Sequence, residues 1–367
     1  RQEIRVLFSP RVDATIRIVN LDEEYGHREF SLSSDIPVGP PGDWGNYLRA
    51  PCQALARRFG EAGGAPGLRG FDALVSSTLP VASGLSSSSA LVIAMGRAVL
   101  KANGLDIPTL EFAEEMARAE RYTGTQGGGM DQAISAGGRA GHASRIEFDP
   151  LRMFETPIPS DWRFVVAHTL VRAEKSGRAQ EAYNSRTREC REALETVAPY
   201  TATSTDPPGH PLGYPLGYPQ LLDRICPQEL VELGERHLDS VLARRFRHVV
   251  TEGARVYDAE HALKRGDRLT FGLLMNSSHE SLREDYEVSS PELDTLVGIA
   301  LGAGATGARL TGAGFGGCIV ALAAPDRLDA VLAALAEGYY RSRGLPGTLD
   351  HVLFVAEASA GASVSEL

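Results

Sequence analysis

The 367-residue sequence has few cysteines, no long apolar run and fewer basic than acidic residues. Its four cysteines, Cys52, Cys190, Cys226 and Cys318, are scattered without metal-ligand spacing. We expect them to be reduced thiols that act as small buried apolar groups, because a disulfide framework is typical of short secreted chains. No apolar run approaches the roughly 18 residues that span a bilayer, and no secretory signal pattern is visible. These absences argue against a disulfide-stabilised or membrane-spanning protein and favour a cytoplasmic one.

The charge balance restricts the class of partner. The sequence contains 47 acidic and 37 basic residues, a formal net charge of −10. This balance argues against a general nucleic-acid or anionic-membrane surface, although a local basic pocket for a phosphate stays compatible with it. We therefore expect a small-molecule partner, and no feature of the sequence specifies an oligomeric state. The length and the 43% hydrophobic content predict roughly two domains with sizeable cores.

The most informative stretch is a serine-rich turn, residues 79–90 (LPVASGLSSSSA), which leads directly into the apolar residues 91–95. At the start of an apolar helix, such a turn leaves the first backbone N–H groups unpaired. Gly84 allows close backbone approach, and the hydroxyls of residues 86–89 can cap the helix or reach a metal, while the helix dipole favours phosphate. The stretch is neither a P-loop nor a Rossmann fingerprint. It predicts a phosphate site, with a serine-rich helix cap that binds nothing as the alternative.

Alternation and helical periodicity predict a mixture of strands and helices. Strands are predicted over 4–8, 15–21, 29–32, 71–76, 146–148, 164–168, 308–311, 319–323 and 352–357. Helices are predicted over 44–59, from the serine turn to 103, and over 109–122, 182–194, 228–233, 249–265, 269–280, 293–302 and 329–340. The proline-rich segment 201–219 is expected to be an exposed insertion without a helix or central strand. The mixture indicates an α+β fold in two domains, 1–175 and 176–367.

Three stretches together resemble one family. The pattern Pro-x-x-x-Gly-Leu-Ser-Ser-Ser, from Pro80 to Ser88, is similar to the phosphate-binding motif of the GHMP kinases. Residues 129–132 (GMDQ) and 311–318 (TGAGFGGC) resemble later motifs of that family, and 283–294 (REDYEVSSPELD) resembles its galactokinase branch specifically. The resemblance runs from about residue 44 to the end of the chain. The sequence departs from the family motifs where Gly129 replaces an aliphatic residue and where alanines replace the usual glycines at 82 and 313.

The resemblance implies an ATP-dependent sugar kinase with a two-domain GHMP kinase fold and an active site between two α+β domains. Phosphoryl transfer requires a phosphate cradle, a divalent metal and a positioned acceptor hydroxyl. The family motifs imply ATP contacts at Pro80, Gly84, Leu85, Ser86, Ser87, Ser88, Gly312, Gly314 and Gly316. Ser88 and Glu120 are implied to hold Mg²⁺, an ion that prefers hard oxygen ligands and keeps several waters. Without the resemblance, Glu120 would be interpreted as a surface charge.

On the substrate side, the resemblance implies that Asp131 faces the sugar hydroxyl, with Gly129 and Tyr183 as further sugar contacts. Asp131 can act as a general base, or it can accept a hydrogen bond and stabilise a nearby cation, and a structural carboxylate is the plain alternative. Tyr183 can equally be an ordinary core residue of its helix. The implied reaction is phosphorylation of a monosaccharide, at the anomeric hydroxyl. The alternatives are a related kinase for arabinose, a uronic acid or an N-acetylhexosamine, and a sensor of sugar and nucleotide without catalysis.

One family segment has no counterpart. Galactokinases carry, before the main strands, an Arg-Val-Asn-Leu-Ile-Gly-Glu-His-Thr-Asp-Tyr segment that supplies an arginine and most sugar contacts. Residues 18–25 (IVNLDEEY) are superficially similar but follow the place where that segment belongs. Because the sequence begins at Arg1, we expect that an upstream segment is missing, and that the chain as given binds nucleotide but turns over slowly.

Overall fold

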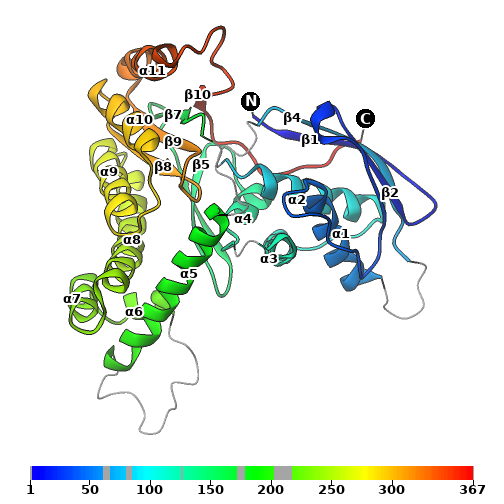
Figure 1. The fold of residues 1–367 in the computed structure, drawn as a ribbon, viewed down its shortest axis with the longest axis horizontal. Helices are drawn as coiled ribbons and strands as arrows, with labels where there is room; N and C mark the ends of the chain where they lie inside the picture. The colour runs from blue at the N-terminus through cyan, green and yellow to red at the C-terminus, as the bar shows by residue number, and fades with distance from the viewer. Residues whose placement is uncertain are drawn as a thin grey trace.

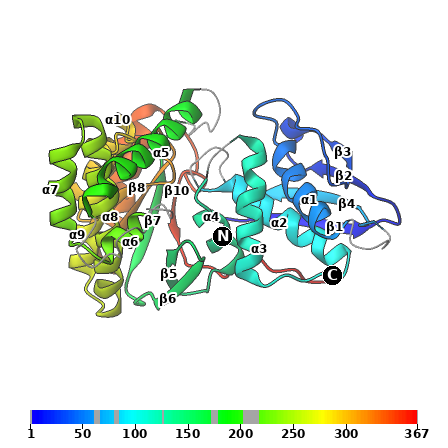
Figure 2. The same ribbon diagram turned by 90° about the horizontal axis from the view of Figure 1, so that it is seen from below.

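The computed structural model describes residues 2–60, 67–79, 85–124, 127–171, 178–201 and 217–366. Its helices and strands form two groups, one from each half of the chain, which lie side by side in both views (Figures 1 and 2). Each group has its own buried apolar cluster, from Ile16 to Leu151 in the first and from Val165 to Leu353 in the second. Sheets and helices occur in both groups, which confirms the predicted α+β class.

The first group is built on a four-stranded sheet with the order β1-β4-β2-β3. Its strands are β1 (Ile4–Pro10), β2 (Thr15–Asn20), β3 (Arg28–Ser31) and β4 (Phe71–Ser77). Strands β2 and β4 pair in parallel, and the other two pairs are antiparallel. The helices of this group are α1 (Gly45–Phe59), α2 (Ser87–Ala102), α3 (Thr109–Glu120) and α4 (Met130–Gly137). A hairpin of β5 (His142–Glu147) and β6 (Arg152–Pro157) follows them. Strand β4 thus precedes the serine turn and α2 follows it, which is the predicted order.

The second group contains an antiparallel sheet with the order β10-β7-β9-β8. Its strands are β7 (Arg163–His168), β8 (Gly307–Thr311), β9 (Cys318–Ala323) and β10 (Leu353–Ala356). Its helices are α5 (Arg178–Val197), α6 (Tyr218–Leu222), α7 (Pro227–His237), α8 (Ser240–Lys264), α9 (Arg268–Glu284), α10 (Pro291–Gly302) and α11 (Leu328–Leu335). Among the described residues, none of the helices has both the length and the apolar character needed to cross a membrane. Strand β7 precedes residue 175 yet pairs with β9 and β10, so the domain division at 175 stays a prediction.

Two differences from the predicted elements have local causes. Helix α8 begins at Ser240, well before the predicted start at 249, because the Asp239 carboxylate caps it by accepting hydrogen bonds from Val241 N and Leu242 N at 2.8 and 3.0 Å. Helix α4 was not predicted, because the glycines at 127–129 indicated a loop. The last of these glycines has a φ of 93° and is the residue from which α4 starts.

The expectation that all four cysteines are buried is wrong for two of them. Cys52 and Cys318 are buried, whereas Cys190 is half-buried and Cys226 is exposed. Cys226 occupies the N-cap position of α7, outside the packed face of that helix.

The proline-rich segment also differs from expectation at its end. Tyr218 and Pro219 form the start of the short helix α6, in which proline is tolerated because the N–H groups of the first turn need no helical partner. At the other end, Thr201 closes a 3-10 turn, Ala198–Thr201. Residues 202–216 lie outside the described residues, so an exposed insertion there stays a prediction.

The C-terminal segment fastens the second group to the first. After β10 the chain crosses to the first group, as the red trace of Figures 1 and 2 shows. Gly361 N donates to Gly138 O and Ala362 N donates to Ser135 O, both at 2.7 Å. These contacts fix the end of α4 against residues 357–366, which we call the C-terminal strap, and α4 carries Asp131 at its other end.

Candidate active site

A cluster of buried polar side chains joins α2, α3 and α4. Ser89 donates to Glu120 Oε2 at 2.8 Å, and Gln132 donates to Ser89 Oγ at 3.0 Å and also to Glu120 Oε2. The three residues are 1%, 6% and 5% exposed, in the order Ser89, Glu120 and Gln132. In the ranges that the structure describes, no lysine or arginine pairs with Glu120. A buried carboxylate whose partners are neutral donors is stabilised by a cation placed beside it.

Asp131 and Tyr183, from the two groups of elements, interact electrostatically. Asp131 stands in the first turn of α4 and is half-buried, next to Gln132. Burial raises the pKa of Tyr183, and the negative charges of Asp131 and Glu120 raise this pKa further. The Tyr183 phenol, on α5, is therefore within electrostatic reach of both carboxylates. Tyr183 belongs to the second group of elements and Asp131 to the first, so this electrostatic interaction spans the two groups.

Gly129 has a structural reason to be glycine. Its φ of 93° lies in the left-handed region, and a Cβ at this position would lie 3.1 Å from Cβ of Ala117. Both conditions favour glycine, since other residues rarely adopt this backbone conformation. Gly129 therefore shapes the turn that presents Asp131, and its contact with sugar stays a prediction.

The serine turn enters α2 in a form suited to an anion. Ser86 has a left-handed φ of 56°, and α2 begins at Ser87 without a capping side chain among the described residues. Residues 85–88 are half-buried, so the start of this 16-residue helix is accessible to a ligand. Pro80 and Gly84 lie outside the described residues, and their roles stay predictions.

The glycine-rich loop between β8 and β9 depends on left-handed backbone. Gly312, Gly314 and Gly316 have φ values of 76°, 80° and 132°. Ala313 is not among the positive-φ residues of the described chain, which explains why a β-carbon is tolerated there. The ATP contacts of the three glycines stay predictions.

Hydrogen bonds hold this loop on two sides. Phe315 N donates to Val288 O at 2.7 Å, and Gly317 N donates to Val171 O at 3.1 Å. Thr169 N in turn donates to Gly317 O at 2.8 Å. The loop is therefore fixed both to the segment after α9 and to the chain that follows β7.

Gly314→Ala is expected to destabilise the protein. A Cβ on residue 314 would lie 2.1 Å from Val288 O, at a φ of 80°. The left-handed backbone costs about 1–2 kcal/mol for alanine, and the overpacking adds about 1–3 kcal/mol. Urea unfolding measures the loss. The matched control is Gly298→Ala on α10, where a Cβ meets no atom within 4 Å. A Gly314→Ala variant as stable as this control would contradict the assigned role of the glycine.

The donor atoms at Glu120 are compatible with Mg²⁺. Its carboxylate and the Ser89 hydroxyl beside it offer hard oxygen ligands, and one or two protein ligands suffice for an ion that keeps its waters. Over the described ranges, no group of three or more His, Cys, Asp or Glu side chains is arranged to hold a metal. The role of Ser88 as a ligand stays a prediction, because the hydroxyl that the structure bonds to Glu120 is that of Ser89.

Two members of the site, Gln132 and Tyr47, were not predicted from the sequence, whereas Ser89 belongs to the serine run 86–89 that was predicted to cap the helix or reach a metal. Gln132 follows Asp131, so it had a signal in its position beside a predicted residue. No signal in the sequence placed Tyr47, on α1, near the site. Burial raises the pKa of Tyr47, and the charge of Glu120 raises this pKa further. The packing of α1 against α2 and α3 brings Tyr47 within electrostatic reach of the Glu120 carboxylate.

Two family models match the parts of the chain that contain these motifs. Residues 46–139 match the family model described as GHMP kinases N terminal domain, and residues 259–341 match GHMP kinases C terminal. The first match contains the serine turn, Glu120 and Asp131, and the second contains the glycine-rich loop.

Curated relatives and solved structures agree with these matches. The chain is 35% identical to a galactokinase from Haemophilus influenzae over 92% of its own length and 80% of that relative. It is 38% identical to a galactokinase from Chloroflexus aurantiacus over 90% of its length and 78% of that relative. A Lactococcus lactis galactokinase solved in complex with galactose superposes with a TM-score of 0.82 at 29% identity, over 99% of this chain and 87% of that one. Leishmania major mevalonate kinase, at 19% identity and a TM-score of 0.58, shares the fold. The chain therefore belongs to the GHMP kinases and is a galactokinase-like sugar kinase.

Proposed function

We propose that the chain transfers the γ-phosphoryl group of ATP to the anomeric hydroxyl of galactose. The observation that carries the proposal is the buried cluster of Ser89, Glu120 and Gln132 next to Asp131, with the Tyr183 phenol from the other half of the chain within electrostatic reach of both carboxylates. The galactokinase relatives and the galactose-bound neighbour support the choice of sugar.

On the acceptor side, Asp131 would take the proton of the attacking sugar hydroxyl. The hydroxyl oxygen forms the new bond to the γ-phosphorus while the bond between that phosphorus and the ADP oxygen breaks. Tyr183 would pack against the sugar. Its raised pKa keeps the phenol neutral, so it adds no negative charge where the charged phosphoryl group arrives.

On the donor side, the start of α2 and the loop 312–317 would bind the phosphates through backbone N–H groups. Glu120 and Ser88 would hold Mg²⁺, which neutralises phosphate charge during transfer when it is bound. Ser89 and Gln132 would orient the Glu120 carboxylate through the hydrogen bonds that the structure contains.

The test is a coupled ADP-release assay over a panel of galactose, arabinose, galacturonic acid, N-acetylgalactosamine and glucose, with a sugar-free blank. We expect galactose to give the highest kcat/KM, and the product to lose its reducing end because the anomeric oxygen carries the phosphate. A higher kcat/KM for another sugar of the panel would replace galactose with that sugar. Tight binding of galactose and nucleotide without ADP release would instead identify a sensor.

We further propose a cytoplasmic location. The Cys52 and Cys318 thiols are buried, and burial raises the pKa of each, to about 12 for Cys318. Such thiols stay protonated and unreactive, as expected of structural cysteines in a reducing compartment.

A further inference from the structure

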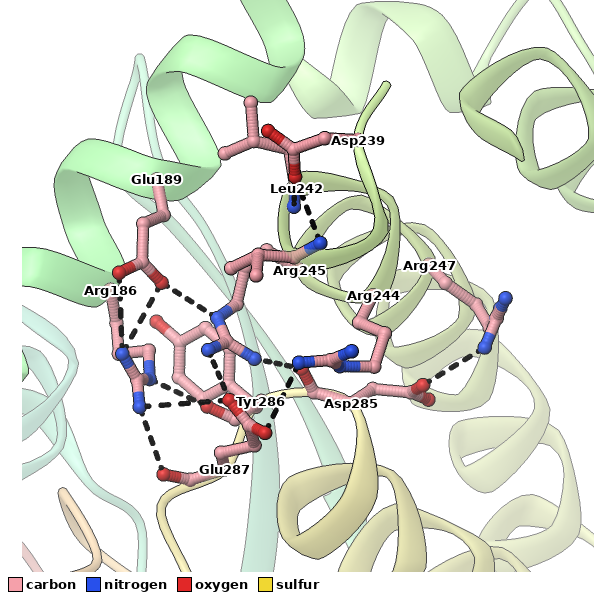
Figure 3. A network of polar contacts seen from close by, with 11 residues as sticks. Arg186, Glu189, Asp239, Leu242, Arg244, Arg245, Arg247, Asp285, Tyr286 and Glu287 are labelled. Carbon is pink, nitrogen blue, oxygen red and sulfur yellow. Dashed lines mark hydrogen bonds and ion pairs between the residues drawn. The ribbon is translucent and has the colours of Figure 1, made fainter. Parts of the chain in front are cut away.

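An arginine of α5 holds the segment 285–288, which follows α9 and which we call the 285–288 bridge (Figure 3). Arg186 donates from Nε to Tyr286 O at 2.7 Å and from Nη2 to Glu287 O at 3.2 Å. Glu287 has a φ of 56°, a backbone conformation that non-glycine residues keep when the surroundings enforce it. The two bonds from α5 are part of that enforcement.

Arg245 holds the same bridge from α8. Its side chain is 2% exposed, although it carries a permanent charge. The guanidinium donates from Nε to Glu189 Oε2 at 2.7 Å, from Nη1 to Asp285 O and from Nη2 to Glu287 Oε2. The bond from Arg245 holds the pKa of Glu287 below its ordinary value. Arg245 therefore ties α5, α8 and the bridge together at one buried point, as the dashed contacts of Figure 3 show.

The bridge continues to the glycine-rich loop. Val288 O accepts the hydrogen bond of Phe315 N at 2.7 Å, and Gly314 packs so closely on Val288 that a Cβ would not fit. At the other end, Arg186 stands three residues after Tyr183 on α5, so the two side chains share a face of that helix. A continuous set of contacts thus links the helix that carries the sugar contact to the loop on the nucleotide side.

We propose that Arg245 is a positioning residue that fixes α5 and the glycine-rich loop in one geometry through the 285–288 bridge. The inference rests on the proposed function, which assigns Tyr183 to the sugar and the loop 312–317 to the nucleotide. The hydrogen-bond partners of Arg245 among the described residues are protein groups, and none of them is assigned to a ligand.

Arginine suits this position for a geometric reason. The three acceptors, Glu189 Oε2, Asp285 O and Glu287 Oε2, surround one planar group whose donors point in fixed directions. A lysine keeps the charge but concentrates its donors on one tetrahedral nitrogen, so it cannot serve three acceptors in this arrangement. Arg245→Lys therefore releases part of the bridge without removing the buried charge.

The experiment measures nucleotide affinity and sugar kinetics in Arg245→Lys. Fluorescent mant-ATP reports the nucleotide Kd in the absence of sugar, and ADP release reports kcat and the KM for galactose. We expect the nucleotide Kd and the galactose KM to rise together, and kcat/KM to fall by about 10- to 100-fold, because displacements near 1 Å have effects of this size.

Two control variants lie on the same helix. Arg255→Lys makes the same exchange at a side chain whose bonds go to Glu252 and Thr251 within α8, and it should leave both constants unchanged. Leu263→Ala removes a buried side chain roughly 27 Å farther along α8, and it should lower stability without changing nucleotide affinity. If Arg245→Lys does not fold, Arg186→Lys cuts the α5 contact with the bridge and should raise the galactose KM.

The inference is overturned if Arg245→Lys, or Arg186→Lys in its place, binds and turns over ligands as the wild type does. It is also overturned if Leu263→Ala, at equal loss of stability, raises the nucleotide Kd as much as Arg245→Lys. Failure of the proposed function is distinguishable, because the wild type would then release no ADP with galactose. In that case the mant-ATP comparison of Arg245→Lys with its two controls still decides the role of Arg245.

Discussion

Asp131→Asn is expected to lower kcat by about 10²-fold or more, on the usual scale of general acid–base catalysis. Asparagine keeps the shape of the side chain and can still accept a hydrogen bond, but it cannot take up the proton of the attacking hydroxyl. The helix should be unaffected, because α4 begins at the backbone of Gly129 and is held at its far end by the C-terminal strap. Steady-state kinetics with ATP and galactose measure the effect, and mant-ATP binding should stay unchanged.

The matched control is Asp258→Asn, which removes one carboxylate from the exposed face of α8. It should retain wild-type kcat. If Asp131→Asn retains it as well, the carboxylate has a structural role, and the position of Asp131 beside the buried Glu120 cluster no longer supports a proton acceptor at this place.

Glu120→Gln is expected to lower turnover by about 10²-fold at limiting Mg²⁺, because it removes the carboxylate that we assign to the metal. The fold should persist, since glutamine fills the same space and a buried charge with neutral partners contributes little to stability. Thermal melting provides a readout that does not depend on activity. Wild-type protein should melt at a higher temperature when MgATP is added, by ligand linkage, and Glu120→Gln should lose the part of this rise that depends on Mg²⁺.

Variants nearby separate metal binding from packing. Glu111→Gln, on the exposed face of α3, should behave as wild type. Ser88→Ala should follow Glu120→Gln, whereas Ser89→Ala should lower the free energy of unfolding by about 1 kcal/mol by removing its bond to Glu120. Wild-type turnover of both Glu120→Gln and Ser88→Ala at limiting Mg²⁺ would show that the metal site lies elsewhere.

The elements around the site were predictable where local chemistry specifies them. Strand β4, the serine turn and α2 follow from a short segment with apolar residues at 71, 73 and 75, a cluster of cap-forming serines and an apolar helix, all contiguous in the sequence. Residues 311–318 were recognisable as a loop because closely spaced glycines are typical of left-handed backbone. Gly312, Gly314 and Gly316 adopt that conformation. Helix α4 was not predicted because a run of glycines indicates a turn, whether or not a helix follows it. Gly129, the last of them, is the residue before α4.

The sequence by itself determined the chemical inventory: a serine-rich turn before an apolar helix, the acidic residues Glu120 and Asp131, and a glycine-rich loop at 311–318. Tertiary structure decided which of these groups meet. Glu120 is buried and bonded to Ser89 and Gln132 because α2, α3 and α4 pack on one another, and helical periodicity cannot say which neighbour a face will meet. Arg245 lies in an ordinary-looking basic stretch, and its burial depends on Glu189 and Glu287, distant residues that α5 and the end of α9 bring to it. A buried charge is stable where several partners converge, and convergence of that kind is a property of the folded chain.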